Sequence, residues 1–259
     1  MTIAAPDYPR AALVTGAARR IGRAIALALA EDGWAVAVHY SASRDDAEAL
    51  VKTIIGRGGR AIPLATDLEN EKEVARLVDR AAIALGPLGL LVNNASTFER
   101  DEALTATRES WDRHMEANLR APFVLSQSLA RQLPAGKQGC IVNLLDQRVW
   151  NLTPHFTSYT LSKAGLWTLT QTLALALAPN IRVNGIGPGP TLPSPRQSDA
   201  QFHQQESVLP LGRGSSPEEI AAAVRFILAA PALTAQMIAL DGGQHLGWAQ
   251  AASRPPVEE

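Results

Sequence analysis

The sequence predicts an α/β fold in which one doubly wound, parallel sheet is covered by helices on both faces. Short apolar runs rich in β-branched residues alternate with longer segments of helical period along most of the 259 residues. The runs are apolar throughout, which is typical of strands that hide both faces from water. Regular strand and helix alternation with right-handed crossovers builds a sheet of about seven parallel strands. No internal repeat or linker divides the chain, so we expect a single domain over residues 1–259.

Each expected element follows from its own pattern of apolar residues. Strands are predicted at the short apolar runs, residues 11–15, 34–40, 61–66, 88–94, 140–145, 181–187 and 236–240. Helices are predicted in the segments between them, residues 21–33, 44–59, 70–86, 109–133, the segment after Phe156, and 217–230. The connection between 188 and 216 is too long for an ordinary loop, and we expect a lid over a substrate pocket there. Residues 1–9 and 249–259 are expected to be flexible ends.

Charge and composition narrow the classes of partner. The 24 Lys and Arg residues nearly cancel the 25 Asp and Glu residues, whereas nucleic acids and anionic membranes attract an excess of positive charge. We therefore predict a small-molecule partner, no nucleic acid and no membrane. The one cysteine, Cys140, lies in an apolar run, which favours a buried thiol and a reducing, cytoplasmic location. We expect no targeting segment and no membrane span, because no stretch has the required length of apolar residues.

A glycine-bearing turn joins the first predicted strand to the first predicted helix. Gly16 and Gly22 stand in "TGAARRIG", where a tight turn directs backbone N–H groups toward an anion such as a dinucleotide pyrophosphate. An NAD site would place Asp or Glu at the end of the second strand. The sequence has hydrogen-bond donors and positive charge instead, which suit the 2′-phosphate of NADPH: Ser41, Ser43 and Arg44, with Arg20 in the turn. Asp67 ends the third predicted strand, where it could hydrogen-bond an adenine amino group or cap the next helix.

Tyr159 and Lys163 are four residues apart in a predicted helix, which places them on one face. An ammonium group near a phenol favours release of the phenolic proton, so Tyr159 could donate a proton near neutral pH. The glycine turn, "VNNAS" and "HMEANL" precede this pair, and "VNGIGPG" and "ALDGG" follow it. In this order the motifs resemble the short-chain dehydrogenase/reductase family, whose fold is Rossmann-type, from about Ala11 to His245.

The resemblance implies a role for each matching residue. Tyr159 would donate the proton, Lys163 would also bind the nicotinamide ribose, and Asn118 would hold a water that relays protons to Lys163. Residues 93–95 would support the sheet beside the cofactor, and residues 187–189 would flank the nicotinamide. An arginine stands where the family has the middle glycine of the turn. The implied NADPH-binding set is Gly16, Arg20, Ile21, Gly22, Ser41, Ser43, Arg44, Asp67, Leu68, Asn94, Ala95, Ser96, Tyr159, Lys163, Pro188 and Gly189.

One position departs from the family. Thirteen residues before Tyr159 the family has a serine that polarises a carbonyl, and this sequence has Asp146. Ser158 cannot replace that serine, because adjacent helical positions point in different directions. A carboxylate suits a substrate with N–H groups or ring nitrogens. Together with the arginine in the glycine turn and the segments 39–43 and 93–98, it resembles the pteridine reductase branch, which has bacterial dihydromonapterin and dihydrofolate reductase relatives.

In that branch the pterin lies between the nicotinamide and an aromatic ring. Phe98 matches the aromatic residue, and Ser96 matches a serine that contacts substrate and cofactor. The resemblance therefore implies hydride transfer from NADPH to a dihydropteridine, dihydromonapterin or dihydrofolate, with Tyr159 protonating the neighbouring ring nitrogen. Asp146 would either help to protonate the ring or anchor it as a carboxylate, and the sequence leaves both open.

Other interpretations fit the same residues. Phe98 could be a packing aromatic, and Asp146 could cap a loop or pair with Arg148 or Lys163 in a reductase of a ketone, quinone or imine. A catalytically silent NADP(H)-binding regulator is a third interpretation, although a sensor has no need of the tyrosine and the lysine. These alternatives predict different substrates for the same fold.

The remaining aromatic and histidine residues are assigned no chemistry. His114 and His245 lack the spacing of metal ligands, so we expect no metal. We assign Trp150, His155 and Trp167 to packing. The segment 164–178 is apolar around much of its helical circumference, and the resemblance implies a homotetramer with two-fold symmetry.

Overall fold

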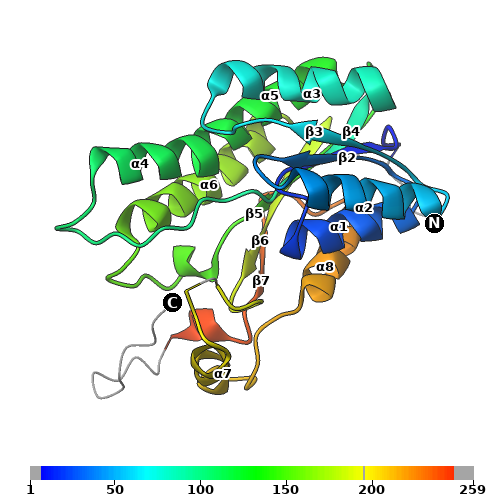
Figure 1. Ribbon diagram of the computed structural model, residues 1–259. Helices are drawn as coiled ribbons and strands as arrows, with labels where there is room; N and C mark the ends of the chain where they lie inside the picture. Colours follow the sequence, from blue (N-terminus) through cyan, green and yellow to red (C-terminus); the bar gives the residue numbers. More distant parts are fainter. Residues whose placement is uncertain (1–6, 195, 248–259) are drawn as a thin grey trace.

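The computed structural model describes residues 7–194 and 196–247, and its strands form one parallel sheet (Figure 1). The sheet has seven strands in the order β3-β2-β1-β4-β5-β6-β7. The prediction of an α/β fold with about seven parallel strands is confirmed. The strands are β1 (Ala11–Val14), β2 (Ala35–Tyr40), β3 (Arg60–Ala65), β4 (Leu88–Asn93), β5 (Gly139–Leu144), β6 (Ile181–Pro188) and β7 (Met237–Leu240).

Helices cover both faces of this sheet (Figure 1). α1, α2 and α8 pack with one another on one face, and α3, α5 and α6 pack on the other, so each face has its own hydrophobic core. Helices between consecutive parallel strands produce these two layers. The helices are α1 (Arg20–Glu31), α2 (Arg44–Gly56), α3 (Glu71–Leu85), α4 (Arg108–Met115), α5 (Ala121–Gln132), α6 (Thr157–Ala176), α7 (Asp199–Ser207) and α8 (Pro217–Ala229).

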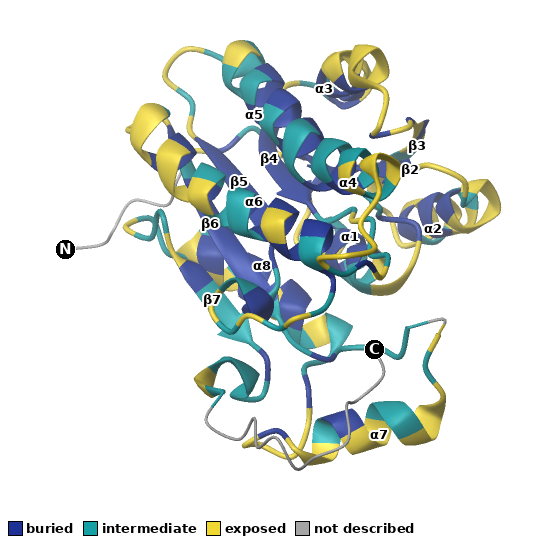
Figure 2. Cartoon of the chain, turned by 90° about the vertical axis from the view of Figure 1, so that its left-hand side faces the viewer, coloured by how far each residue is buried: buried dark blue, intermediate teal, exposed yellow. Residues whose placement is uncertain are grey.

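The central strands are the most deeply buried part of the chain (Figure 2). Every residue of β1, β4 and β5 is buried, which explains why their sequences are apolar without alternation. Cys140 lies within β5 and is fully buried, and burial raises the pKa of its thiol to about 11. The expected buried thiol is confirmed.

The strand order reverses between β1 and β4. β1 continues to β2 and β3 on one side, whereas β4 and the later strands extend the sheet on the other side. In open α/β sheets ligands bind in the crevice outside the carboxyl ends of the strands at such a reversal. The segments that leave β1, β4, β5 and β6 therefore meet at one edge of the sheet.

The predicted helix over 109–133 is interrupted. α4 passes through a π-helical turn, Glu116–Arg120, before α5 begins. A π-turn inserts one extra residue into the helix and is often found at functional sites. This turn places Asn118 in the buried interior, where Asn118 contacts the segment that follows β4.

The expected lid segment contains a helix that the sequence analysis did not predict. α7 begins with a capping box in which Ser198 and Gln201 exchange hydrogen bonds with each other's backbone N–H groups. The capping box and the following turn stabilise this short helix within the segment.

The expected flexible ends are only partly described. Residues 1–6 and 249–259 lie outside the described residues, whereas residues 7–9 contact the body of the protein. The Tyr8 ring lies 6.1 Å from the Trp34 ring, and Arg182 donates to the Tyr8 hydroxyl at 2.6 Å. Within the described residues, no helix is long and apolar enough to cross a membrane.

Candidate active site

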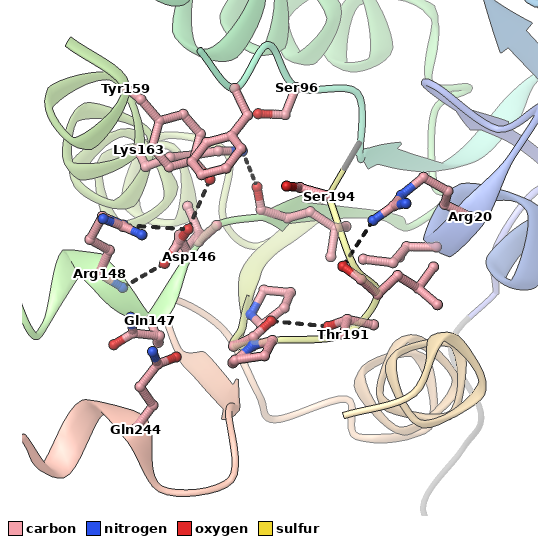
Figure 3. A pocket seen from close by; sticks show the side chains of 18 of the residues that line it. Arg20, Ser96, Asp146, Gln147, Arg148, Tyr159, Lys163, Thr191, Ser194 and Gln244 are labelled. Atoms are coloured by element: carbon pink, nitrogen blue, oxygen red, sulfur yellow. Dashed lines mark hydrogen bonds and ion pairs between the residues drawn. The ribbon is translucent and has the colours of Figure 1, made fainter. Parts of the chain in front are cut away.

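A cavity of about 290 Å³ opens at the carboxyl edge of the sheet, below the segment that leads to α7 (Figure 3). It brings together residues from the glycine turn, from the ends of β4, β5 and β6, and from α6 and α7. Many of the predicted cofactor and catalytic residues line it: Arg20, Ile21, Asn94, Ser96, Phe98, Asp146, Tyr159, Lys163, Pro188 and Gly189.

Asp146 and Tyr159 contact each other in this cavity. The Tyr159 hydroxyl donates a hydrogen bond to Asp146 Oδ2 at 2.9 Å (Figure 3). Asp146 follows β5 directly, and its other carboxylate oxygen accepts from the Arg148 N–H at 2.7 Å, so it also caps the 3₁₀ turn Gln147–Val149. The acid therefore has the capping role that one interpretation of the sequence predicted, and it has a second contact as well. It caps a turn, and it faces the tyrosine.

Lys163 is buried beneath this pair. Its ammonium donates to the Leu144 carbonyl at 2.8 Å and lies 5.8 Å from the centre of the Tyr159 ring. Burial lowers the pKa of Lys163 to about 8, and the charge of Asp146 opposes this shift. The Lys163 ammonium can therefore lose its proton near pH 8, close to physiological pH.

Asp101 caps the helix that carries Tyr159. Phe156, at the N-cap position of α6, has left-handed backbone geometry (φ 59°) and no side-chain cap of its own. The Asp101 carbonyl accepts from the Phe156 N–H at 2.7 Å, and its carboxylate accepts from the Ser158 N–H at 3.0 Å. The Ser158 hydroxyl also donates to this carboxylate and lies 2.7 Å from His114 Nδ1. Ser158 thus points away from the cavity, as predicted.

Asn118 connects the π-turn to the segment after β4. Its amide accepts from the Thr97 N–H at 2.8 Å and donates to the Thr97 carbonyl at 2.9 Å. It also accepts from the Ser96 hydroxyl at 3.2 Å and donates to Ser162 on α6 at 3.0 Å. Asn118 therefore fixes the backbone beside Ser96. The water relay that the family resemblance implies for it stays a prediction.

Phe98 lies in an aromatic cluster at the cavity wall. Its ring is stacked on Phe156 with centroids 4.5 Å apart and planes at 8°, and it meets the Tyr159 ring edge-on at 4.6 Å. The guanidinium groups of Arg196 and Arg148 lie over Phe98 and Phe156, at 5.4 Å and 5.1 Å. Phe98 therefore has Phe156 stacked on one face and the Arg196 guanidinium over its ring, while it also lines the cavity.

The glycine turn is tightly packed against the end of β4. Asn94 donates to the Thr15 and Gly16 carbonyls at 2.8 Å and 3.1 Å. Gly16 has a positive φ of 60°, and a Cβ at Gly22 would lie 2.3 Å from the Gly16 carbonyl oxygen. Both positions therefore require glycine. α1 begins without a side-chain cap, so its first backbone N–H groups fit an anion such as a dinucleotide pyrophosphate.

His39, to which the sequence analysis assigned no role, forms a hydrogen bond with this turn. Its Nδ1 accepts from the Gly16 N–H at 3.0 Å, and its Nε2 lies 3.1 Å from the Thr66 carbonyl. Burial lowers the pKa of His39 to about 4, so the ring is neutral at physiological pH. A neutral ring with its proton on Nε2 satisfies both contacts.

The residues predicted to bind the 2′-phosphate lie in two different places. Ser41 is exposed after β2, Ser43 is at the N-cap position of α2, and Arg44 pairs with Glu48 at 2.8 Å. Arg20 instead extends toward the segment before α7, where its guanidinium donates to the Pro193 and Leu192 carbonyls at 3.0 Å and 3.2 Å (Figure 3). In this conformation Arg20 is bound to the α7 segment.

Asp67 and Leu68 occupy the turn between β3 and α3. Asp67 Oδ1 accepts from the Glu69 N–H at 3.0 Å, and the N-cap position of α3 is Asn70, so Asp67 is not the helix cap that the sequence left open. Leu68 is buried in the core. The adenine contact of Asp67 stays a prediction.

Gly189 follows β6 at the floor of the cavity. A Cβ there would lie 2.7 Å from the Asp241 Cα, so the close approach of the two backbones requires glycine. Ala95 donates its N–H to the Thr15 hydroxyl at 3.0 Å and lies beside the turn. These residues hold the cavity floor without using their side chains.

Sequence reasoning missed several residues that line or support the cavity. Most of them contact residues that are distant in the sequence, and only the "SDAQ" capping pattern at the start of α7 offered a local signal. The missed residues are His39, Asp101, Gln147, Phe156, Arg196, Phe202, Gln205 and Gln244. In the described part of the chain, no group of three or more His, Cys, Asp or Glu side chains is placed to hold a metal.

The aromatic and histidine residues that were assigned no chemistry do not line the cavity that holds Asp146 and Tyr159. The Trp150 ring is 6.3 Å from Trp167 and 5.4 Å from His245. His114 is fully buried and accepts from the Glu99 N–H at 3.1 Å. His155 lies 3.0 Å from Glu102 at the exposed rim.

Comparison with known proteins gives the family of this chain. A family model described as Enoyl-(Acyl carrier protein) reductase matches residues 16–245. A 3-oxoacyl-[acyl-carrier-protein] reductase of Synechocystis sp. is 33% identical over 236 residues, which is 90% of this chain and 95% of that protein. The chain belongs to the short-chain dehydrogenase/reductase family. The prediction of an oxidoreductase of this family is thereby confirmed.

Solved structures give a second comparison. The FolM alternative dihydrofolate reductase 1 from Brucella canis, complexed with NADP, has a TM-score of 0.93 and 46% identity, and covers 97% of this chain and 100% of that chain. The corresponding protein from Brucella suis, also in complex with NADP, has a TM-score of 0.89 and 48% identity, with 96% and 98% covered. These structures agree with the resemblance to the dihydrofolate reductase relatives of the pteridine reductase branch.

Proposed function

We propose that the protein is an NADPH-dependent reductase of a pterin ring, with dihydropteridine, dihydromonapterin or dihydrofolate as substrate. The observation that carries this proposal is the hydrogen bond from Tyr159 to Asp146 at the position where the family has a serine. A carboxylate cannot donate a hydrogen bond to a ketone oxygen, but it can accept one from a ring N–H or amino group. The similarity to two dihydrofolate reductases named FolM supports the same reading.

The chain's own residues would orient and protonate the substrate. NADPH would supply the hydride when bound. Tyr159 would pass its hydroxyl proton to the ring nitrogen beside the reduced carbon, and its contact with Asp146 holds that hydroxyl in the cavity. The ring would lie against Phe98, on the face that Phe156 does not cover.

The cofactor would lie across the carboxyl edge of the sheet. The glycine turn and the first turn of α1 would bind the pyrophosphate, and Lys163 would bind the nicotinamide ribose. Ser41, Ser43 and Arg44 would bind the 2′-phosphate, with Arg44 exchanging its contact with Glu48 for the phosphate. The NADP-bound FolM structures support NADPH as the cofactor of this chain.

The deciding experiment follows NADPH oxidation by the purified protein with dihydrobiopterin, dihydromonapterin and dihydrofolate. We expect turnover that Tyr159→Phe and Asp146→Ser both reduce, Tyr159→Phe by about 10²-fold or more, because the first removes the proton donor and the second removes the carboxylate that holds it. Turnover in the wild type that Asp146→Ser leaves unchanged would contradict the role given to Asp146. Competitive inhibition by a 2,4-diaminopteridine would support a pterin slot.

A second candidate is a reductase of a 3-oxoacyl thioester. The sequence relatives named 3-oxoacyl-[acyl-carrier-protein] reductase favour it, at 33% identity for the one from Synechocystis sp.. Acetoacetyl-coenzyme A, assayed beside the pterins, separates the two. Activity with the thioester and none with any pterin would replace the first proposal by the second.

We also propose a cytoplasmic homotetramer. α6 exposes Leu161 and Leu175, with 45% and 82% of their surfaces accessible, and α8 exposes Phe226 with 58%. Large apolar side chains exposed on two helices favour contact with other subunits. Light scattering coupled to gel filtration measures the mass, and a monomer at micromolar concentration would contradict this assembly.

A further inference from the structure

Arg196 stands at the edge of the cavity without an acidic partner among the described residues. Its guanidinium donates to the Phe98 carbonyl at 3.1 Å and lies 5.4 Å above the Phe98 ring. Its side chain is exposed, in contrast to Arg148, which is buried next to Asp146. The positive charge of Arg196 is therefore available to an anion.

The backbone of Arg196 is held in place although its side chain is exposed. The Arg196 N–H donates to Ser194 Oγ at 3.3 Å, and the next N–H, of Gln197, donates to the Ser194 carbonyl at 3.0 Å. α7 begins three residues later with its capping box at Ser198. The side chain extends from this backbone over the Phe98 ring.

The position of this guanidinium follows from the packing of Phe98. One face of the Phe98 ring is stacked on Phe156 with 4.5 Å between centroids, which leaves no room for a third group. Arg196 must therefore lie on the other face, which its guanidinium covers at 5.4 Å and which a stacking ligand would have to share with it. A flat heterocycle that stacks on this face would move the guanidinium outward, to where substituents of the heterocycle leave the cavity.

The lining of the cavity strengthens the preference for an anion at this exit. Among the described lining residues Asp146 is the one carboxylate, whereas Arg20, Arg148 and Lys163 are basic. An acidic group on a ligand therefore meets one carboxylate among these lining residues, and the carboxylate of Glu99, which follows Phe98, is paired with Arg113 at 2.9 Å. A neutral substituent gains nothing comparable from an arginine.

We propose, on the basis of the proposed pterin reductase function, that Arg196 selects pterins that carry a carboxylate tail. Its guanidinium binds a carboxylate of the benzoyl-glutamate group of dihydrofolate, while small pterins with neutral side chains do not reach it. Arg196 is thus a specificity residue, and the reacting pair does not depend on it.

The test compares two substrates in matched variants. We expect Arg196→Gln to lower kcat/KM for dihydrofolate about tenfold, mainly through KM, because a hydrogen bond to a charged group is lost. Dihydromonapterin should be reduced as in the wild type, and Arg196→Lys should recover part of the dihydrofolate activity. Arg100→Gln is the control, since Arg100 is on the Phe98 segment, is exposed and pairs with Glu102 at 2.9 Å.

Equal losses with both substrates would overturn the proposal, because they would show that Arg196 only holds Phe98 in place. Unchanged kinetics with both substrates would overturn it too. A calorimetric titration of the NADP-loaded protein with methotrexate and with its glutamate diester separates binding from turnover. Tail-dependent binding that Arg196→Gln removes supports the proposal even without turnover, whereas a wild type that neither binds nor reduces any pterin refutes the proposed function itself.

Discussion

Removal of the Asp101 carboxylate should destabilise the fold and the catalytic helix together. Asp101 is 4% exposed, and its carboxylate accepts from the Ser158 N–H, from the Ser158 hydroxyl and from the Ser110 hydroxyl. It comes from the segment that carries Phe98 and caps the helix that carries Tyr159. Asp101→Ala breaks this connection while it leaves both site residues in the chain.

The magnitude follows from the donors that lose their acceptor. The Ser110 hydroxyl can turn to the Thr107 carbonyl at 3.2 Å, whereas the buried Ser158 N–H loses its acceptor and the buried Ser158 hydroxyl is left with its contact to His114 Nδ1 at 2.7 Å. A buried donor without a partner costs about 1–3 kcal/mol, so Asp101→Ala should lower the free energy of unfolding by about 2–5 kcal/mol. Asp101→Asn keeps one acceptor for the Ser158 N–H and should cost about half as much.

Urea unfolding, followed by tryptophan fluorescence at one fixed protein concentration, measures these differences. Asp112→Ala is the control, because the half-exposed Asp112 side chain pairs with the exposed Arg108 at 2.6 Å and should contribute little. A stability of Asp101→Ala equal to that of Asp112→Ala, or no difference between the alanine and asparagine variants, would refute the reasoning.

The same carboxylate makes stability depend on pH. Burial raises the pKa of Asp101, but the hydrogen bonds from Ser158 and Ser110 outweigh burial, so the net pKa lies below the ordinary value of 3.8. A lowered folded-state pKa contributes stability that is present above pH 3.8 and is lost as the pH falls through the folded-state pKa. Asp101→Asn should therefore flatten the stability profile in this acidic range.

Three further predictions concern the turn and the lysine. His39 is buried and neutral, with a pKa of about 4 against an ordinary 6.5, so the free energy of unfolding should fall by about 3 kcal/mol as the pH falls from 6.5 to 4. His39→Gln should remove this dependence in urea titrations. Gly22→Ala should weaken NADPH binding tenfold or more in a fluorescence titration, because its Cβ would lie 2.3 Å from the Gly16 carbonyl, whereas Gly56→Ala meets no atom within 4 Å. Lys163→Met should abolish turnover yet raise the free energy of unfolding at pH 7 by about 1–2 kcal/mol, since burial disfavours the ammonium; a less stable variant would contradict this.

The sheet could be predicted from the sequence because its strands are local and strongly patterned. β4 and β5 are apolar at almost every position, and the structure buries all of their residues. The helix over 109–133 was predicted as continuous, since a π-turn adds only one residue and leaves the apolar pattern nearly intact. α7 was missed because its sequence has a capping pattern but almost no apolar stripe.

The site was predictable where a residue type stands at a fixed spacing from another. The spacing of Asp146, Tyr159 and Lys163 brings all three to the cavity, as expected. Asp101 and Phe156 were not predictable in this way, because Asp101 is 57 positions from the serine it caps and nothing in either segment signals the contact. Arg20 likewise reaches carbonyls 172 and 173 positions away.

Asp146 is tolerated in the cavity because its surroundings compensate its charge. Arg148 Nε lies 4.0 Å from its carboxylate, the Arg148 N–H donates to it, and the charge of Asp146 favours the protonated form of the buried Lys163. The acid and the two cations thus form one electrostatic unit, with Tyr159 as its hydrogen-bond donor. A serine at this position would leave both cations without that counter-charge. Conversion of this site to the serine arrangement of the family should therefore require a change at Arg148 as well as at Asp146.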